Sequence, residues 1–215
     1  MTALILASNS PRRSELIDLL ELPFEVFPAD IDENQRAGEP PVAYVQRMAC
    51  QKALAIAGDQ HGLVIAADTI VVDEDELLGK PAHPAEARRM LGQLRGRVHQ
   101  VFTHIAIVEP LTGQSYDAVC ATHVPMRAYS DAEIEAYIAT GDPMDKAGAY
   151  GIQNTAFHPV EGLHGCFASV MGLPLCHLAV GLRVFGVKVS EGLPGRCQAF
   201  LNYRCPVFST ILGVS

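Results

Sequence analysis

The sequence predicts an α/β fold, and three observations carry this prediction. Of the 215 residues, 49% are hydrophobic, a globular composition that excludes a disordered chain. Continuous apolar runs, typical of buried strands, occur at 3–7, 63–72 and 101–108. Segments with the apolar spacing of helices alternate with these runs, at 11–21, 41–57, 84–95, 130–139 and 173–186. Strands that alternate with helices are the pattern of α/β proteins.

Local signals mark the ends of several of these elements. Ser10 precedes Pro11, which places an N-cap residue before a proline at the first helical position. Ser130 followed by Glu133 is a capping box, and Gly141 closes the helix that begins there. The first and fourth predicted helices therefore have well-defined starts.

Two other stretches have a local interpretation. The acidic run 73–76 lies between two apolar pairs and most simply forms the solvated tip of a hairpin. A metal site of the Asp-x-Asp type is the alternative for Asp73 and Asp75. We expect residues 170–175 to be a strand that passes into a helix at Pro174.

The chain changes character from about residue 188. Residues 188–215 contain one acid, Glu191, against Lys188, Arg196 and Arg204, and they show no sustained apolar period. This composition is compatible with a disordered extension, a packed arm or foreign sequence. We assign the segment no function.

The net charge and the cysteines limit the classes of partner and the cellular compartment that we expect for this protein. The chain has 16 Lys and Arg against 24 Asp and Glu, a formal net charge of −8, which argues against a general nucleic-acid binder. No apolar stretch approaches the ~20 residues of a membrane span, and the apolar start lacks the basic region of a signal peptide. The six cysteines show no C-x-x-C pair and indicate reduced thiols. We therefore expect a soluble cytoplasmic protein without nucleic-acid or membrane partners, in which attraction of an anionic substrate is local.

The first candidate site is the junction of the opening strand and helix. Free amide groups at a helix N-terminus favour phosphate, and the hydroxyls of Ser8 and Ser10 can donate further hydrogen bonds. Arg12 and Arg13 stand in the first turn, where the helix dipole disfavours cations, and a polyphosphate would explain this placement. Surface arginines after a well-capped helix start are the alternative.

Carboxylates and lysines supply the other candidates. Asp68 interrupts a run that otherwise indicates a buried strand, so it is a candidate general base or metal ligand. Glu33 ends an acidic cluster that suits a divalent cation, although a solvated acidic turn explains the cluster about as well. Lys80 follows Gly79 in a turn and offers a point charge for phosphate, with a plain surface turn as the alternative. Lys52 lies beside small apolar residues of its helix, where it either reaches solvent, the default, or points into a cleft.

The last candidate is the loop 141–153, which is rich in glycine and alanine. It carries the paired charges of Asp145 and Lys146, and Gln153 can read an amide edge through two hydrogen bonds. The loop is neither a P-loop nor a dinucleotide-binding fingerprint.

The order of these motifs is more informative than any one of them. Together they closely resemble the Maf family of nucleoside triphosphate pyrophosphatases, over about residues 3–187. The motifs are Ser8-Asn9-Ser10-Pro11-Arg12-Arg13, Glu33, Lys52, Ala67-Asp68-Thr69-Ile70-Val71, Gly79-Lys80-Pro81, Gly96-Arg97-Val98-His99-Gln100-Val101 and Asp145-Lys146-Ala147-Gly148-Ala149-Tyr150-Gly151-Ile152-Gln153. We therefore divide the chain into a nucleotide pyrophosphatase domain over 1–187 and a C-terminal extension over 188–215.

The resemblance implies an elongated α/β fold of two lobes, with a mixed sheet and flanking helices around a central cleft, related to the inosine triphosphate pyrophosphatases and often dimeric. It also implies hydrolysis between the α- and β-phosphates, with Mg²⁺ or Mn²⁺ as cofactor. Asp68 would accept the proton of the attacking water, and Glu33 with Asp68 would hold the metal. The triphosphate would be bound by Ser8, Ser10, Arg13, Lys52 and Lys80.

Three positions indicate the subgroup. This sequence resembles the subgroup that acts on dTTP and UTP at Arg12, Thr69 and Gln153. A 7-methyl-GTP pyrophosphatase is the alternative. The stretch 154–167 departs from the family pattern beside the expected base pocket, and Asp142 replaces the usual Glu. Two other functions compete: a nucleotide-binding regulator of septum formation without turnover, and a nucleotidyltransferase that uses the acidic run at 73–76.

Overall fold

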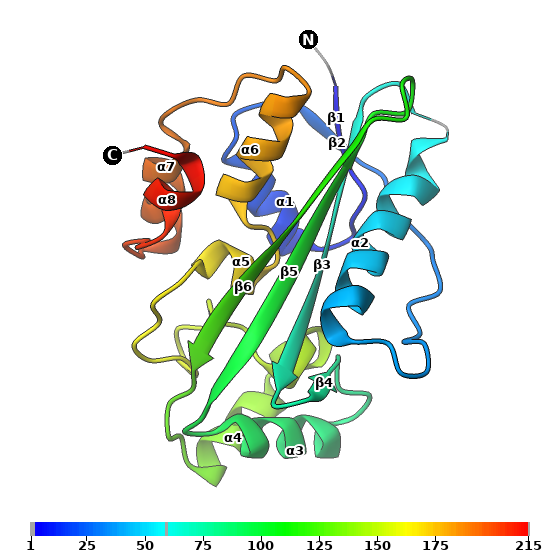
Figure 1. The fold of residues 1–215 in the computed structure, drawn as a ribbon. Helices are drawn as coiled ribbons and strands as arrows, with labels where there is room; N and C mark the ends of the chain where they lie inside the picture. The colour runs from blue at the N-terminus through cyan, green and yellow to red at the C-terminus, as the bar shows by residue number, and fades with distance from the viewer. Residues whose placement is uncertain (1–2, 59, 215) are drawn as a thin grey trace.

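The structure is a computed structural model that describes residues 3–58 and 60–214, and these residues form a six-stranded mixed sheet. The strand order is β2-β1-β3-β5-β6, with β4 paired to the edge of β3 (Figure 1). The strands are β1 (Leu4–Leu6), β2 (Phe24–Val26), β3 (Leu63–Asp73), β4 (Glu76–Leu78), β5 (Val98–Val108) and β6 (Ser115–Pro125). The predicted α/β class is confirmed, and so are the three strands that the apolar runs indicated.

The sequence interpretation missed β6 for a physical reason. This strand pairs with β5 along its whole length in antiparallel register, and every second residue from Ser115 to His123 is solvent-exposed. Half-buried strands alternate polar and apolar residues and lack a continuous apolar run. β1 pairs in parallel with β2 and β3, whereas β3, β4, β5 and β6 pair antiparallel.

Helices cover both faces of the sheet. On one face α2 (Pro41–Ala57) packs small side chains against β3 and β5. On the other face lie α1 (Pro11–Asp18), α5 (Phe167–Met171) and α6 (Leu175–Val184), around the main hydrophobic core. The expected strand over 170–174 is wrong, because Val170 and Met171 belong to α5, Gly172 ends that helix in a left-handed conformation, and the next two residues are not a strand. The expected helix does follow, since α6 begins at Leu175 with Pro174 as its N-cap.

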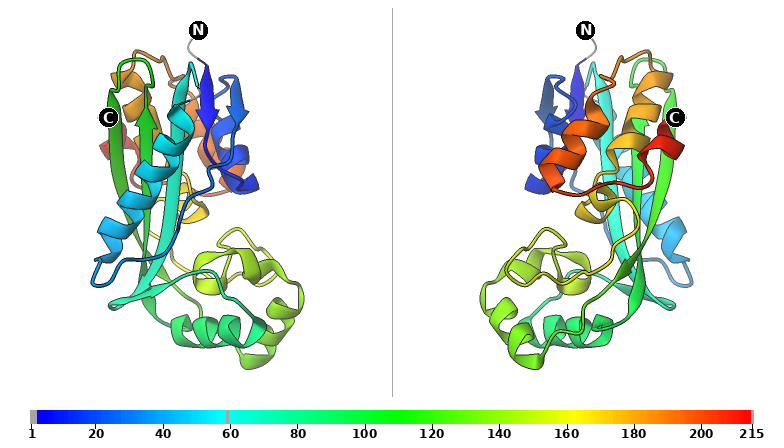
Figure 2. Two further views of the ribbon diagram at one scale, coloured as in Figure 1. Left: turned by 90° about the vertical axis from the view of Figure 1, so that its right-hand side faces the viewer. Right: turned by 90° about the vertical axis from the view of Figure 1, so that its left-hand side faces the viewer.

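A second lobe lies beyond the far end of the long strands, and Figure 2 shows the elongated shape that results. It contains α3 (Pro84–Leu94), α4 (Asp131–Ala139) and the short 3-10 helices η1 (Asp142–Asp145) and η2 (Ala147–Ala149). The capping box at Ser130 and Glu133 is present with both of its hydrogen bonds. The Ser10 hydroxyl, by contrast, makes no capping hydrogen bond with the described backbone, although Ser10 does occupy the N-cap position.

The C-terminal segment is a packed arm. Its helices α7 (Leu193–Leu201) and α8 (Phe208–Leu212) lie against α5 and α6, and Leu193 is buried in the main core. The described part of the chain contains no helix with the length and apolarity to cross a membrane.

Candidate active site

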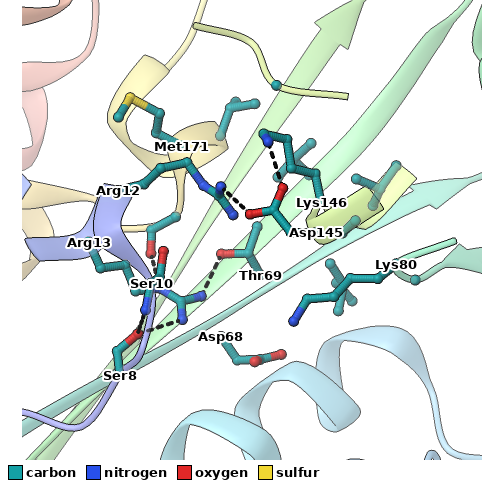
Figure 3. Close-up of a pocket in the computed structure, with 18 of the residues that line it drawn as sticks. Ser8, Ser10, Arg12, Arg13, Asp68, Thr69, Lys80, Asp145, Lys146 and Met171 are labelled. Atoms are coloured by element: carbon teal, nitrogen blue, oxygen red, sulfur yellow. Dashed lines mark hydrogen bonds and ion pairs between the residues drawn. The ribbon is translucent and has the colours of Figure 1, made fainter. Parts of the chain in front are cut away.

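A cleft of about 570 Å³ lies between the sheet and the second lobe. Its floor is one edge of β3: β1 pairs with residues 63–65 and β4 with residues 71–73, and between these partners residues 68–71 line the cleft. Alternation along the strand turns Asp68 toward the α2 face and Thr69 toward the α1 face. Both side chains line the cleft, and Figure 3 shows them at its centre.

The turn between β1 and α1 forms one end of the cleft. Arg13 donates from Nη1 to Ser8 Oγ (3.3 Å) and from Nη2 to Thr69 Oγ1 (3.3 Å). Its Nε donates to the carbonyl oxygen of Gly172 (2.9 Å), and the Ser10 N–H donates to Ser8 Oγ (3.1 Å). Burial lowers the pKa of Arg13, an effect that the charge of Asp68 opposes, and the guanidinium stays a cation at neutral pH. The turn thus presents a fixed cation beside two hydroxyls.

Lys52 reaches into the cleft from α2 and joins two carboxylates. Its Nζ lies 2.6 Å from Asp68 Oδ1 and 2.7 Å from Glu33 Oε1, and only 8% of the residue is exposed. The default expectation that Lys52 reaches solvent is therefore wrong, and the alternative is correct. Burial raises the pKa of Glu33, but the hydrogen bond from Lys52 and the charges of Lys52, Lys80 and Arg13 outweigh it and lower that pKa overall.

The structure brings all the predicted site residues to this cleft. Lys80, exposed in the turn after β4, points its amine toward the space near Asp68 in Figure 3. Gln153 lines the opposite wall, which the second lobe supplies. The lining set among the described residues includes Ser8, Ser10, Arg12, Arg13, Glu33, Lys52, Asp68, Thr69, Lys80 and Gln153.

An ion-pair network forms the wall of the second lobe. Arg12 Nη1 lies 2.8 Å from Asp145 Oδ2, so the pair joins α1 to η1 across the cleft. Lys146 is 7% exposed and donates to Asp145 Oδ1 (2.6 Å) and Asp142 Oδ1 (2.9 Å). The Tyr137 hydroxyl donates to Asp142 Oδ2 (2.6 Å). These bonds hold the loop that leads to Gln153.

The sequence interpretation did not single out two other lining residues, Tyr44 and Gly172. Burial raises the pKa of Tyr44 to about 12, with smaller contributions from the charges of Asp68 and Glu33, so the hydroxyl stays protonated. It donates to the Glu33 carbonyl oxygen (2.8 Å) and steadies the acidic segment. Gly172 acts through its carbonyl oxygen, which a sequence motif of side chains does not reveal.

The cleft is locally basic although the whole chain is acidic. Among its described lining residues are five basic side chains (Arg12, Arg13, Lys52, Lys80, Lys146) and three acidic ones (Glu33, Asp68, Asp145). Cations gathered in a cleft concentrate an anionic ligand despite an acidic net charge. A polyphosphate chain suits this arrangement.

The donor set fits a divalent cation that also binds substrate. No group of three or more His, Cys, Asp and Glu side chains among the described residues is arranged to hold a metal ion. Glu33 and Asp68 nevertheless converge, because each contacts the same Lys52 nitrogen. Mg²⁺ takes one or two carboxylates together with water and phosphate oxygens, so two carboxylates beside a phosphate site are sufficient.

The acidic run at 73–76 lies at the tip of the β3–β4 hairpin, as expected, and not in the cleft lining. The prediction that this run is solvated is wrong for Asp73, which is 3% exposed and accepts a hydrogen bond at Oδ2 from Gln93 Nε2 (3.0 Å). Glu74 pairs with Arg97 (2.6 Å). These acids therefore have structural partners.

This chain is similar to several known proteins. The model of the family described as Maf-like protein matches residues 3–185. A dTTP/UTP pyrophosphatase of Moorella thermoacetica is 47% identical over 190 residues, which cover 88% of this chain and 98% of that protein. A dTTP/UTP pyrophosphatase of Anaeromyxobacter dehalogenans is 48% identical over 185 residues, covering 85% and 94%. Among solved structures, the Staphylococcus aureus Ham1 protein aligns with a TM-score of 0.43 at 16% identity, over 59% of this chain and 72% of that one.

Proposed function

Because the chain belongs to the Maf-like protein family, we propose that it hydrolyses dTTP and UTP to the nucleoside monophosphate and pyrophosphate. Relatives that carry this activity in their names match almost their whole length to this chain. The observation that carries the proposal is the cleft, in which Asp68 lies among five basic side chains.

The cations bind the triphosphate in this proposal. Arg13 and the hydroxyls of Ser8 and Ser10 take one end of the chain of phosphates, and Lys80 approaches from the opposite side in Figure 3. Lys52 adds a cation beside Asp68 and Glu33. Charge develops on the leaving pyrophosphate as the α–β bond breaks. Cations that are already in place stabilise this charge without reorganisation, which lowers the barrier.

Asp68 is the proposed proton acceptor. Lys52 donates to Oδ1 and orients the carboxylate, and Oδ2 takes the proton of the attacking water. The water oxygen forms a bond to the α-phosphorus, the bond from that phosphorus to the bridging oxygen breaks, and pyrophosphate leaves with the electron pair of the broken bond. Burial of Lys52 fixes the carboxylate in this orientation.

Glu33 and Asp68 are the proposed holders of Mg²⁺ or Mn²⁺. When bound, the ion would neutralise charge on the phosphate oxygens. The lowered pKa of Glu33 keeps this side chain ionised as a ligand at neutral pH. Lys52 orients both carboxylates toward the phosphates.

Gln153 is the proposed reader of the base. Its amide both donates and accepts, so it matches the imide edge of thymine or uracil. Arg12 and Thr69 shape the neighbouring surface: Arg12 joins the base-side loop through Asp145, and Thr69 accepts from Arg13. The resemblance of these three positions to the subgroup that acts on dTTP and UTP favours these substrates over 7-methyl-GTP.

The first experiment is a substrate panel. Purified protein is incubated with Mg²⁺ or Mn²⁺ and dTTP, UTP, CTP, GTP, ATP, ITP, 5-methyl-UTP or 7-methyl-GTP, and monophosphate is separated from diphosphate by chromatography. Monophosphate and pyrophosphate from dTTP and UTP are the expected products. Turnover of 7-methyl-GTP alone would overturn the base assignment, and tight binding without turnover would favour the regulator.

A double variant that neutralises two acidic side chains tests whether the protein is instead a nucleotidyltransferase. Glu74→Gln with Asp75→Asn removes exposed acids of the hairpin tip, which lies outside the cleft lining. We expect the dTTP hydrolysis rate to stay within twofold of wild type. Loss of activity would favour the acidic run as the catalytic metal site.

The proposal extends to the cellular compartment and the oligomeric state. All six cysteines are free thiols, as suits a reducing compartment, and we propose a cytoplasmic enzyme. We also propose a homodimer, which light scattering after size-exclusion chromatography would test.

A further inference from the structure

We propose that the C-terminal arm, residues 188–214, positions Arg13 for the triphosphate by bracing the two helices that hold it, α1 and α5. Arg196 and Tyr203 are the positioning residues. The inference rests on the proposed function, because it concerns the same phosphate site.

Arg13 depends on α1 and α5 together. It belongs to the first turn of α1, and its Nε donates to the carbonyl oxygen of Gly172, the residue that ends α5 (2.9 Å). A movement of either helix would therefore change the direction of the guanidinium. Rigid placement of a charged group matters for catalysis, since a displacement of about 1 Å can cost a large part of the rate.

Arg196 of α7 caps the C-terminal end of α1. Its Nε donates to the carbonyl oxygen of Leu19 (2.9 Å), and its Nη1 lies 3.1 Å from Glu21 Oε2. A cation at the C-terminal end of a helix interacts favourably with the helix dipole. Arg12 and Arg13 stand at the other end, where that dipole disfavours them, so Arg196 offsets a cost that the phosphate site imposes on α1.

Tyr203 holds the segment that leads into α5. Its hydroxyl accepts from the Gly165 N–H (3.2 Å) and lies within donating distance of the carbonyl oxygens of Leu163 (3.1 Å) and Gly165 (3.0 Å). Its ring packs on Phe167, the first residue of α5, with centroids 5.5 Å apart. The segment has little room to shift, because a Cβ on Gly165 would lie 2.7 Å from Thr122 Cγ2.

The arm has an apolar base that anchors both contacts. Leu193 is 1% exposed within the main core, and Cys197 and Leu201 share an apolar patch with Cys166 and Leu175 of the main body. Figure 2 shows α7 in orange-red beside the blue α1 in the right-hand view. The arm thus connects α1 to α5 from outside the cleft.

Most of the C-terminal arm, which braces α1 and α5, lies beyond the part of this chain that matches the family. The family match ends at residue 185, and 190 matched residues already account for 98% of the Moorella relative. A relative of this length has few residues left from which to form such an arm. We therefore expect loss of the brace to weaken the enzyme and not to abolish its activity.

The test compares two arginine variants of the full chain. Arg196→Met removes the contacts to α1, and Arg204→Met removes an equal charge from an exposed position of the same arm. For dTTP at a temperature well below unfolding, we expect Arg196→Met to lower kcat/KM roughly tenfold. Arg204→Met should stay within twofold of wild type. Arg196→Lys, which keeps a donor for Leu19, should recover part of the loss.

A double-mutant cycle separates positioning from general destabilisation. In an Arg13→Ala background the added effect of Arg196→Met on kcat/KM should disappear, because the arm acts through Arg13. A lower Tm with unchanged kcat/KM would overturn the proposal, as would an undiminished loss in the Arg13→Ala background.

Two further measurements keep the test decisive. Tyr203→Phe retains the ring on Phe167 and removes only the hydroxyl contacts, so it carries the test if Arg196→Met does not fold. Its kcat/KM should fall severalfold, and a wild-type value would overturn the proposal. Absence of dTTP turnover in wild type would refute the proposed function alone. The brace is then measured by calorimetry with inorganic triphosphate, whose Kd should rise roughly tenfold in Arg196→Met and stay unchanged if the inference is wrong.

Discussion

Replacing Asp68 with asparagine gives the sharpest test of the proposed chemistry. The amide keeps the size of the carboxyl group, and its oxygen can still accept from Lys52, which now donates to Asp68 Oδ1 at 2.6 Å. Lys52 also keeps its second carboxylate, Glu33, at 2.7 Å. The substitution therefore removes the proton acceptor without leaving a buried cation unpaired.

The expected magnitude follows from these contacts. A general base contributes typically 10²- to 10⁴-fold, so the barrier should rise by about 3–5 kcal/mol and kcat should fall accordingly. The free energy of unfolding should change by no more than about 1 kcal/mol, because Lys52 retains a charged partner. In the absence of divalent ion the nucleotide should bind at least as tightly as to wild type, since the cleft loses a negative charge that repels phosphate.

The assay measures pyrophosphate release from dTTP, together with nucleotide binding by calorimetry in EDTA and thermal unfolding. Asp117→Asn is the matched control: Asp117 lies on β6 outside the cleft lining and accepts from His104 (2.8 Å) and Gln46 (3.1 Å). It should leave kcat within twofold. A kcat of Asp68→Asn within tenfold of wild type would remove Asp68 from its proposed role.

Three other predictions concern stability and specificity. Burial lowers the pKa of His99 from 6.5 to about 4. Between these two pH values the unfolded chain binds a proton at this side chain and the folded chain does not, so the free energy of unfolding should fall by up to about 3 kcal/mol as the pH drops from 6.5 to about 4. Urea unfolding at pH 7 and 4.5 should show a weaker pH dependence for His99→Gln, and an equal dependence would contradict this cause. Gly148→Ala should lower the free energy of unfolding by about 1–3 kcal/mol, because φ is +68° and the new Cβ would meet both γ carbons of Val71 at 3.0 Å. Gly141 also has a positive φ but has open space around it, so thermal unfolding of Gly141→Ala should show only the smaller conformational cost. Gln153→Ala should keep hydrolysis but reduce the kcat/KM ratio of dTTP over GTP by roughly 10- to 100-fold, and a retained preference would exclude Gln153 as the base reader.

Much of the fold was accessible from the sequence because its signals are local. The helix over 41–57 has the bounds that the apolar spacing indicated, and the capping box at Ser130 forms both of its expected bonds. The opening strand and helix were also recognisable, since Pro11 and the small residues before it act within a few positions. The order of the motifs identified the family. The candidate residues in those motifs line one cleft in the folded chain.

Tertiary contacts decided the features on which the mechanism depends. The direction of Lys52 follows from Asp68 on β3, and the hold on Arg13 comes from Gly172, 159 residues away. The arm is ordered because Leu193 enters the main core and Arg196 reaches Leu19, neither of which its own composition reveals. Periodicity and caps report interactions within one or two turns, whereas the free energy that orients a buried charge or packs an arm comes from partners that only folding brings together.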